Sequence, residues 1–186
     1  DLNKIKEFLS SDLFNPLQSI TLTGGECFLH PEIDSILDYL YSYYQEKKVK
    51  EINIVTNGYF TKKVTDVVEK YKGIKIHVSL DGLEEKHNLQ RGDVKAFEFS
   101  MQTLKSLKHI KPTVKYTITP YNYKDLFNVY KLCVDNDLKF LFKFAESEVG
   151  NYYHRLDLRE SMDLTEEQLL ECKEVIKKIL KLEYDA

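Results

Sequence analysis

The sequence predicts an α/β fold with a parallel sheet, either a closed or partial (β/α) barrel or an open, doubly wound sheet. Short apolar runs end near residues 23, 56, 79, 119 and 144, and segments of helical periodicity separate them. The spacing between these ends is roughly 20–40 residues, the size of βαβ units. Connections of that length that carry helices imply parallel pairing. In either architecture a ligand collects at the carboxyl ends of the strands.

Composition sets the outer limits of the prediction. The 186 residues, 42% of them hydrophobic and 31% charged, fit one soluble domain with a sizeable core. A net charge of −3 argues against general nucleic-acid binding. No apolar run approaches the roughly 18 residues of a membrane span. Cys27, Cys133 and Cys172 are odd in number and far apart, which indicates reduced thiols and a cytoplasmic protein.

Five strands and about six helices are expected in alternation. The strands are the apolar runs at residues 18–23, 51–55, 74–80, 114–119 and 139–144. The helices are the segments whose apolar residues recur at spacings of three and four, namely residues 2–14, 31–44, 61–71, 94–109, 124–136 and the stretch that follows Thr165.

Local signals mark several boundaries. Thr61 is predicted to cap the third helix, and Gly73 to end it. Thr165 and Gln168 form a capping box that opens the last helix. The stretch from Gly82 to about Asp93 is expected to be a loop. Residues 145–163 are polar, and Asn151–Arg155 within them is interpreted as a surface loop or a substrate contact.

The first strand of the sheet is expected to lie upstream of the chain. A chain that opens on a helix and then enters a parallel sheet lacks the strand that should precede that helix. The sequence also starts at Asp1 and has no charged-then-apolar leader. We therefore interpret residues 1–186 as a single domain cut from a longer protein.

The sharpest local motif is Thr23-Gly24-Gly25-Glu26, directly after the first strand. Two adjacent glycines let the backbone approach a ligand closely, because no Cβ intervenes. The Glu26 carboxylate could hold an ammonium group. The same residues could also form a tight turn with an exposed acid.

Later strand ends repeat the pattern of small polar groups. Thr56 and Asn57 follow one strand, Ser79 ends the next, and Arg91 lies twelve residues further on. Each has an ordinary interpretation as a turn residue, a satisfied core hydroxyl or a solvated charge. Together, hydroxyls and amides for ribose, Arg91 for a carboxylate and Glu26 for an ammonium suit an amino acid joined to a nucleoside.

Three motifs in order carry a family resemblance: TLTGGECFLHPEI, NIVTNG and HVSLDGLEEKHNLQRG. The chain resembles the radical S-adenosylmethionine (SAM) enzymes from about residue 18 to 144. The resemblance is closest to the branch with molybdenum-cofactor biosynthesis protein A, sulfatase-maturing enzymes and SPASM-type peptide-modifying enzymes. It implies a partial, TIM-like (β/α) barrel whose cofactor is SAM.

The resemblance also implies individual roles. Gly24, Gly25 and Glu26 match the GGE motif that meets the methionine amino group of SAM. Ser79 and Arg91 match the serine and arginine that contact its ribose and carboxylate. The pair Thr56 and Asn57 matches the TNG segment near the ligand. Asn122 also fits the branch, or caps a helix.

The chain departs from the family pattern in three places. Cys27 stands where proline is usual, and we expect it to be a buried small residue rather than a ligand. Asn88 follows His87 where the branch has aspartate. The CxxxCxxC motif that binds three irons of a [4Fe–4S] cluster is absent, and the five histidines are scattered. We therefore identify no metal ligand and no catalytic residue, and expect the cluster in the parent protein only.

The implied parent enzyme cleaves SAM reductively, and a 5′-deoxyadenosyl radical then abstracts hydrogen from a substrate. The substrate is expected to be a small molecule, such as a cofactor precursor, or a peptide, and the electron donor a flavodoxin or ferredoxin. The fragment alone is expected to be inactive. One alternative is a nucleotide- or phosphate-binding α/β enzyme that uses Gly24-Gly25 as an anion loop. The other is a degenerate barrel that serves as a binding scaffold.

Overall fold

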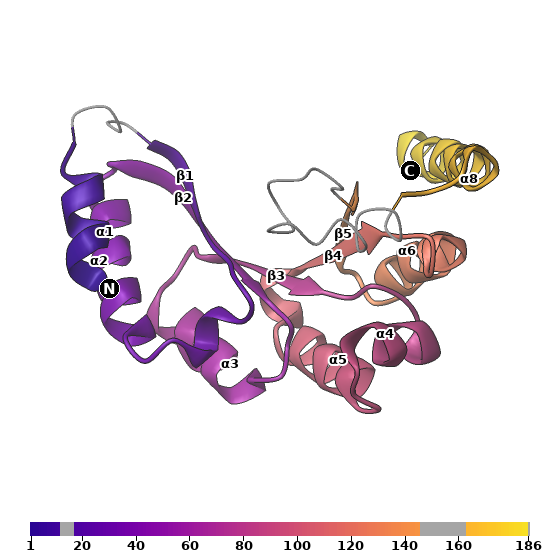
Figure 1. Ribbon diagram of the computed structural model, residues 1–186. Helices are drawn as coiled ribbons and strands as arrows, with labels where there is room; N and C mark the ends of the chain where they lie inside the picture. The colour runs from indigo at the N-terminus through magenta and orange to yellow at the C-terminus, as the bar shows by residue number, and fades with distance from the viewer. Residues whose placement is uncertain (12–16, 146–162, 186) are drawn as a thin grey trace. The chain divides into compact units, whose positions relative to one another are not determined.

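The computed structural model describes residues 1–11, 17–145 and 163–185, which fall into two compact units (Figure 1). Unit 1 consists of Asp1–Val78 and Phe99–Pro112. Unit 2 consists of Ser79–Glu98 and Thr113–Ala186. The expected Asn151–Arg155 loop lies outside the described residues.

Unit 1 is built on parallel strands covered by helices. The strands are β1 (Leu17–Leu22), β2 (Val49–Thr56) and β3 (Lys75–Ser79), whose last residue belongs to unit 2. The helices are α1 (Leu2–Leu9), α2 (Ile33–Gln45), α3 (Thr61–Lys70) and most of α5 (Ala96–Ser106), with 3₁₀ turns at Cys27–Leu29 and Lys108–Ile110. The strand β2 pairs in parallel with both neighbours, so its alternate residues Ile52, Ile54 and Thr56 are buried.

The start of α3 corrects one expectation. The N-cap residue is Phe60, and Thr61 is already helical. The Thr61 hydroxyl oxygen lies 2.6 Å from that of Thr103 on α5. The prediction that Thr61 caps the helix is therefore wrong, because its hydroxyl joins two helices instead. The rest of α3 follows its apolar period, with Val64, Val67 and Val68 buried.

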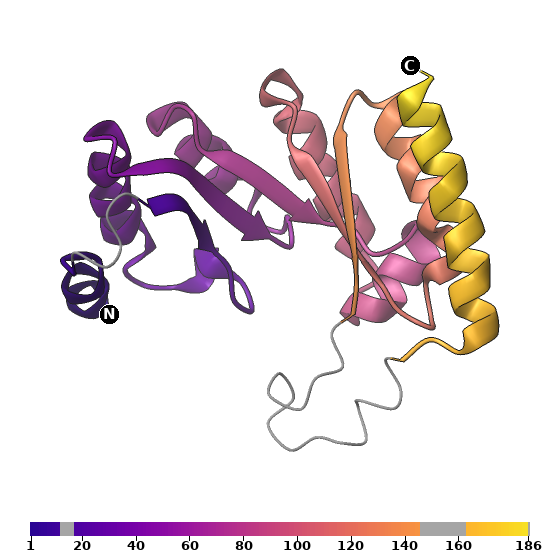
Figure 2. The same cartoon turned by 90° about the horizontal axis from the view of Figure 1, so that it is seen from above.

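Unit 2 contains the second pair of parallel strands. Its strands are β4 (Thr113–Ile118) and β5 (Lys139–Phe144). Its helices are α4 (Glu84–Arg91), α6 (Leu126–Asp135) and α8 (Glu166–Tyr184), with a 3₁₀ turn at Tyr123–Asp125. The helix α8 runs beside α6 (Figure 2), and the predicted capping box of Thr165 and Gln168 opens it.

The expected loop from Gly82 to Asp93 is the main error. It contains the helix α4, which ends at Gly92 in the left-handed conformation (φ +66°). The helix shows no apolar stripe, because its buried position is taken by His87 while Leu89 is exposed. Arg91 accordingly lies in the last turn of a helix and not in a loop. With α4, the described residues contain seven α-helices rather than about six.

The strands follow one another in the sheet in chain order, β1-β2-β3-β4-β5. The parallel α/β class predicted from the spacing is therefore confirmed. Among the described helices, none is both long enough and apolar enough to cross a membrane.

Candidate functional site

The turn after β1 leaves an open stretch of backbone. Gly24 has φ +144°, a conformation that residues with a side chain rarely adopt, and both Gly24 and Gly25 are exposed. A Cβ built on either glycine would meet no atom within 4 Å. A ligand can therefore approach the main chain here, as the sequence predicts.

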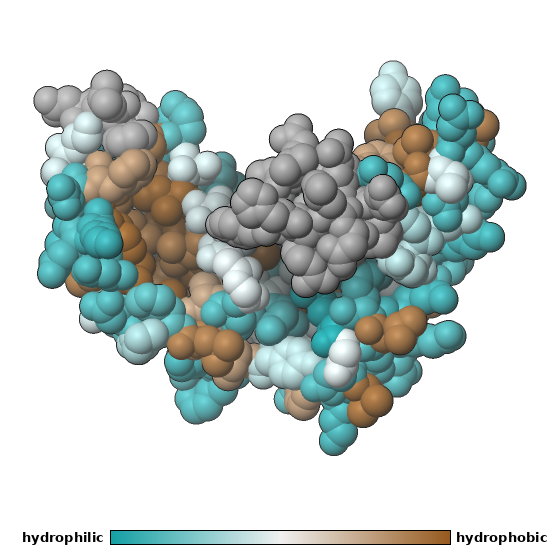
Figure 3. Space-filling view, in the orientation of Figure 1, coloured by the Kyte–Doolittle hydropathy of each residue, from teal (hydrophilic) through white to brown (hydrophobic). Residues whose placement is uncertain are grey.

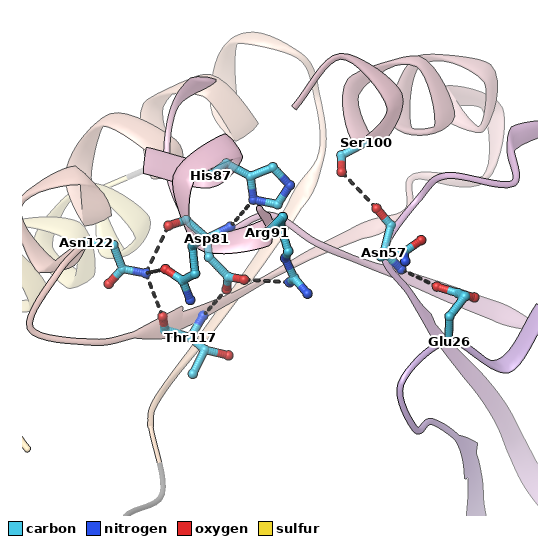
Figure 4. A network of polar contacts seen from close by, with 9 residues as sticks. Glu26, Asn57, Asp81, His87, Arg91, Ser100, Thr117 and Asn122 are labelled. Atoms are coloured by element: carbon cyan, nitrogen blue, oxygen red, sulfur yellow. Dashed lines mark hydrogen bonds and ion pairs between the residues drawn. The ribbon is translucent and has the colours of Figure 1, made fainter. Parts of the chain in front are cut away.

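The carboxylate of Glu26 is held by the end of the neighbouring strand (Figure 4). The Asn57 amide donates to Glu26 Oε2 at 2.7 Å, and the Thr56 hydroxyl donates to the same oxygen at 3.0 Å. The Phe28 amide donates to Oε1 at 3.2 Å. The Cys27 thiol, a weak donor, can turn either to Oε1 or to the Val55 carbonyl oxygen, each 3.7 Å from its Sγ. A carboxylate offers about four lone-pair positions, so the three N–H and O–H donors leave one for a ligand cation when the thiol turns to Val55. The structure thus brings Glu26, Thr56 and Asn57 together at one edge of unit 1.

These contacts specify what Thr56 and Asn57 do. The only proton of the Thr56 hydroxyl is used on Glu26, and its oxygen also accepts from the Gly58 amide. The Asn57 side-chain oxygen accepts from the Tyr59 amide, and its carbonyl accepts from the Ser100 hydroxyl (Figure 4). Both residues therefore orient the Glu26 carboxylate, a role that the sequence did not indicate.

A cavity lies beside this turn. It has a volume of about 340 Å³, within the range of small-molecule sites. The double-glycine turn and Glu26 form its polar wall, and Ile5, Leu22, Ile33 and Ile36 are its apolar residues. Figure 3 shows apolar atoms gathered between α1–α2 and β1–β2 in this part of unit 1.

Cys27 is a buried thiol, as expected. Its Sγ lies 3.7 Å from Glu26 Oε1 and from the Val55 carbonyl oxygen. Burial, and then the Glu26 carboxylate, raise the pKa of Cys27 to about 12. Across residues 1–11, 17–145 and 163–185, no three His, Cys, Asp or Glu residues are placed to hold a metal ion.

The predicted residues of unit 2 are Ser79 and Arg91. Ser79 is half-buried, and within the described part of the chain no residue hydrogen-bonds to its hydroxyl. Arg91 forms an ion pair through Nη2 with Asp81 Oδ2 at 2.5 Å (Figure 4). The Arg91 side chain is 31% exposed and that of Asp81 only 5%. The Arg91 side chain is thus anchored through Nη2 and still partly exposed.

Asp81 and His87, which lie around Arg91, were not predicted as site residues from the sequence, and the role of Asn122 was still open. The Asp81 amide donates to His87 Nδ1 at 3.0 Å, so the proton of the neutral imidazole is on Nε2. Burial, and then the charge of Arg91, lower the pKa of His87 to about 4. Asn122 Nδ2 donates to the carbonyl oxygens of Asp81 and Thr117, each at 2.9 Å. Asn122 is the N-cap residue of the 3₁₀ turn Tyr123–Asp125, but its side chain makes no capping hydrogen bond there.

One signal could have pointed to this network. Asp81 directly follows the apolar run of β3, where a carboxylate without a partner would be costly to bury. The motif HVSLDGLEEKHNLQRG contains Asp81, but an Asp-Gly pair is also typical of a simple turn. Only the structure shows that the Asp81 carboxylate is buried and paired.

The anion-loop alternative disagrees with the geometry at Gly24-Gly25. The glycines lead into a 3₁₀ turn of three residues, Cys27–Leu29. Its cap is the Glu26 carboxylate, which accepts from the Phe28 amide. A negative charge therefore already occupies the place that a phosphate would take.

Comparisons with known proteins give a consistent family. The model of the radical SAM superfamily matches residues 1–133. The antilisterial bacteriocin subtilosin biosynthesis protein AlbA of Bacillus subtilis is 34% identical over 96 residues, which are 50% of this chain and 20% of that protein. The sporulation killing factor maturation protein SkfB of the same organism is 27% identical over 131 residues, 69% of this chain and 30% of its own length. The GTP 3′,8-cyclase of Aliarcobacter butzleri is 20% identical over 143 residues, 75% of this chain and 43% of its own length. The chain thus spans less than half of each of these relatives.

Solved structures agree with the fold. Native anSMEcpe with bound AdoMet and a Kp18Cys peptide has a TM-score of 0.54 at 20% identity, over 69% of this chain and 38% of that one. A hexahistidine-tagged form of anSMEcpe with bound AdoMet has a TM-score of 0.53 at 21% identity, over 69% and 37% of the two chains. This likeness confirms the partial, TIM-like (β/α) barrel over the open sheet. With a family model that matches 133 of its 186 residues, the chain belongs to the radical SAM superfamily.

Proposed function

We propose that the chain is the SAM-binding core of a radical SAM enzyme and that Glu26 binds the ammonium group of SAM. The observation that carries the proposal is the Glu26 carboxylate itself. Three donors fix it beside the open Gly24-Gly25 turn and leave lone-pair capacity for a cation. A carboxylate that is already ordered loses little freedom when a ligand binds.

The remaining donors suit the other parts of SAM. Ser79 offers a hydroxyl for the ribose, and Asn57 an amide nitrogen. Arg91 offers the solvent-facing part of its guanidinium for the carboxylate. When bound and reduced, SAM supplies a carbon radical that takes a hydrogen atom from a substrate. The part of the described chain is to bind and orient SAM.

The residues present do not fit a [4Fe–4S] cluster. All three cysteines of the sequence are buried, and burial raises the pKa of each thiol. An iron–sulfur cluster needs thiolates that converge on it. We propose that the cluster belongs to the whole enzyme, held by residues other than these, and we assign no step through it to this chain.

For the whole enzyme we propose a peptide substrate. The support is that AlbA and SkfB are named for the biosynthesis of a bacteriocin and the maturation of a killing factor. A small-molecule substrate remains the second candidate, because the matched cyclase is named for GTP. A flavodoxin or ferredoxin would supply the electron, in the cytoplasm.

The test is SAM binding to the purified chain, measured by calorimetry or by ligand-detected NMR. Glu26→Gln keeps the shape and removes the charge, so we expect SAM to bind about tenfold more weakly, the effect of losing one charge-assisted contact of about 1.4 kcal/mol. Asp66→Asn removes an exposed carboxylate of α3 that pairs with Lys62, and should leave the affinity unchanged.

Two outcomes would contradict the proposed role of Glu26. If the chain shows no SAM binding, or if Glu26→Gln binds SAM as tightly as the natural chain, the proposed role of Glu26 is wrong. Circular dichroism of the variant checks that its fold is retained.

A further inference from the structure

The geometry points to Asp81 as the positioning residue that aims Arg91 at the carboxylate of SAM. This inference rests on the proposed function, because it concerns the same ligand. It assigns to Asp81 a role that neither its place in an Asp-Gly turn nor its burial alone would suggest.

Asp81 is fixed through all of its polar groups. Its amide donates to His87 Nδ1, and its carbonyl accepts from Asn122 Nδ2. One carboxylate oxygen, Oδ1, accepts from the Thr117 amide at 2.9 Å. The other, Oδ2, receives Arg91 Nη2. The residue is 3% exposed, so the carboxylate cannot turn to another partner in solvent.

Arg91 is the more exposed member of the pair. It lies in the last turn of α4, where a long side chain at the helix end can adopt many rotamers. The ion pair to a rigid, buried carboxylate restricts these rotamers before any ligand arrives. Nη2 of the guanidinium then faces Asp81, and the partly exposed side chain keeps other N–H donors for a ligand. Such preorganisation is what a carboxylate ligand needs from an arginine.

The negative charge of Asp81 could also weaken the binding of a ligand carboxylate to Arg91. Asp81 is negative, and a ligand carboxylate on the same guanidinium would be repelled by it. His87 adds no compensating charge, because burial keeps its imidazole neutral. If Asp81 mainly orients Arg91, removing its charge weakens SAM binding. If Asp81 mainly repels the carboxylate of SAM, removing its charge strengthens SAM binding, so a measured affinity distinguishes the two.

The experiment compares SAM with decarboxylated SAM, which keeps the sulfonium and the nucleoside but lacks the carboxylate. The natural chain should bind SAM more tightly than the analogue. In Asp81→Asn we expect SAM to bind about tenfold more weakly and the analogue to bind as before. Glu174→Gln removes an exposed ion pair of α8 in the same unit and should change neither affinity.

Each other outcome contradicts a defined step. If Asp81→Asn weakens both ligands equally, Asp81 only supports the fold. If SAM binding is unchanged or tighter, repulsion outweighs orientation and the inference is wrong. If the natural chain binds SAM but does not distinguish it from the analogue, Arg91 does not bind the carboxylate, and the inference fails while the role of Glu26 stands.

A measurement on the natural chain covers the case in which Asp81→Asn does not fold. The sequence contains three arginines, Arg91, Arg155 and Arg159, so the guanidinium signals are easily separated by NMR. Arg91→Lys assigns the Arg91 signal. We expect its Nη2 protons, which the ion pair to Asp81 Oδ2 holds, to exchange slowly with water before ligand is added, and to shift with SAM but not with the analogue. An Arg91 signal that exchanges as fast as an exposed arginine would overturn the inference.

Discussion

Glu26 combines a structural and a ligand-binding role in one carboxylate. Its oxygens join the turn after β1 to the amide of Asn57 and the hydroxyl of Thr56 at the end of β2. Each of these donors would lose its partner if the carboxylate were truncated. A change that removes the charge and keeps the shape, such as Glu26→Gln, is therefore the informative one, because it keeps one accepting oxygen whereas a truncation would remove every acceptor from the strand ends.

His87 should make folding depend on pH. Burial and the charge of Arg91 lower the pKa of His87 to about 4, whereas an imidazole in the unfolded chain titrates near pH 6.5. The unfolded state therefore binds a proton that the folded state does not, and the stabilisation present above about pH 6.5 is lost as the pH falls toward about 4. Between about pH 7 and about pH 5 we expect the free energy of unfolding to fall by about 2 kcal/mol through His87. Urea titrations at the two pH values measure it.

The control for His87 is His87→Asn. The asparagine oxygen can accept from the Asp81 amide near the place of Nδ1, but it does not titrate. The variant should therefore lose less stability between the two pH values than the natural chain. The raised pKa of Asp81 acts in the opposite direction, and it is common to both chains. Equal losses in the two chains would show that another group is responsible.

At the scale of elements, α4 is a helix that the periodicity of apolar residues does not predict. The helices α2 and α3 were predicted because their buried apolar residues recur at helical spacing. The helix α4 has eight residues and buries a histidine, so its sequence carries no such stripe. Its polar partners, Asp81 and the Val94 carbonyl that Asn88 contacts, lie outside the helix. A helix specified by such contacts cannot be found from the local pattern.

Gly92 should contribute measurably to the stability of the fold, because it ends α4 in the left-handed conformation. It adopts φ +66°, and a Cβ there would meet no atom within 4 Å. Gly92→Ala therefore brings backbone strain without a clash, and we expect unfolding to be easier by about 1 kcal/mol. Gly92→Asn should cost less, because asparagine tolerates the left-handed conformation. Urea denaturation of the three chains tests the order, and an alanine variant as stable as the natural chain would contradict it.

At the scale of the whole molecule, the parallel pairing was predictable from spacing and the site network was not. Five strands separated by helices imply parallel pairing, but both a barrel and a doubly wound sheet satisfy that spacing, and only the family resemblance favoured the barrel, whose strands follow in chain order. The contact of Glu26 with Asn57 spans 31 residues, and that of Asp81 with Thr117 spans 36. Both depend on how strand ends align, which no short motif encodes. The sequence could therefore predict which residues end the strands, but not which of them bind one another.

The distribution of the three thiols is the last property of the whole chain that can be tested. Cys27, Cys133 and Cys172 are all buried in separate places, and burial raises the pKa of Cys27 and Cys133 to about 12 and that of Cys172 in the same direction. Because the thiolate is the reactive form, we expect the folded chain to react with Ellman's reagent at least about a hundredfold more slowly than the urea-unfolded chain. Ferrous iron and sulfide added to the folded, reduced chain should likewise produce no cluster absorbance, since thiolates are the ligands. Rapid labelling of even one thiol in the folded chain would show that the interior around it opens, and would return that cysteine to the candidates for a ligand.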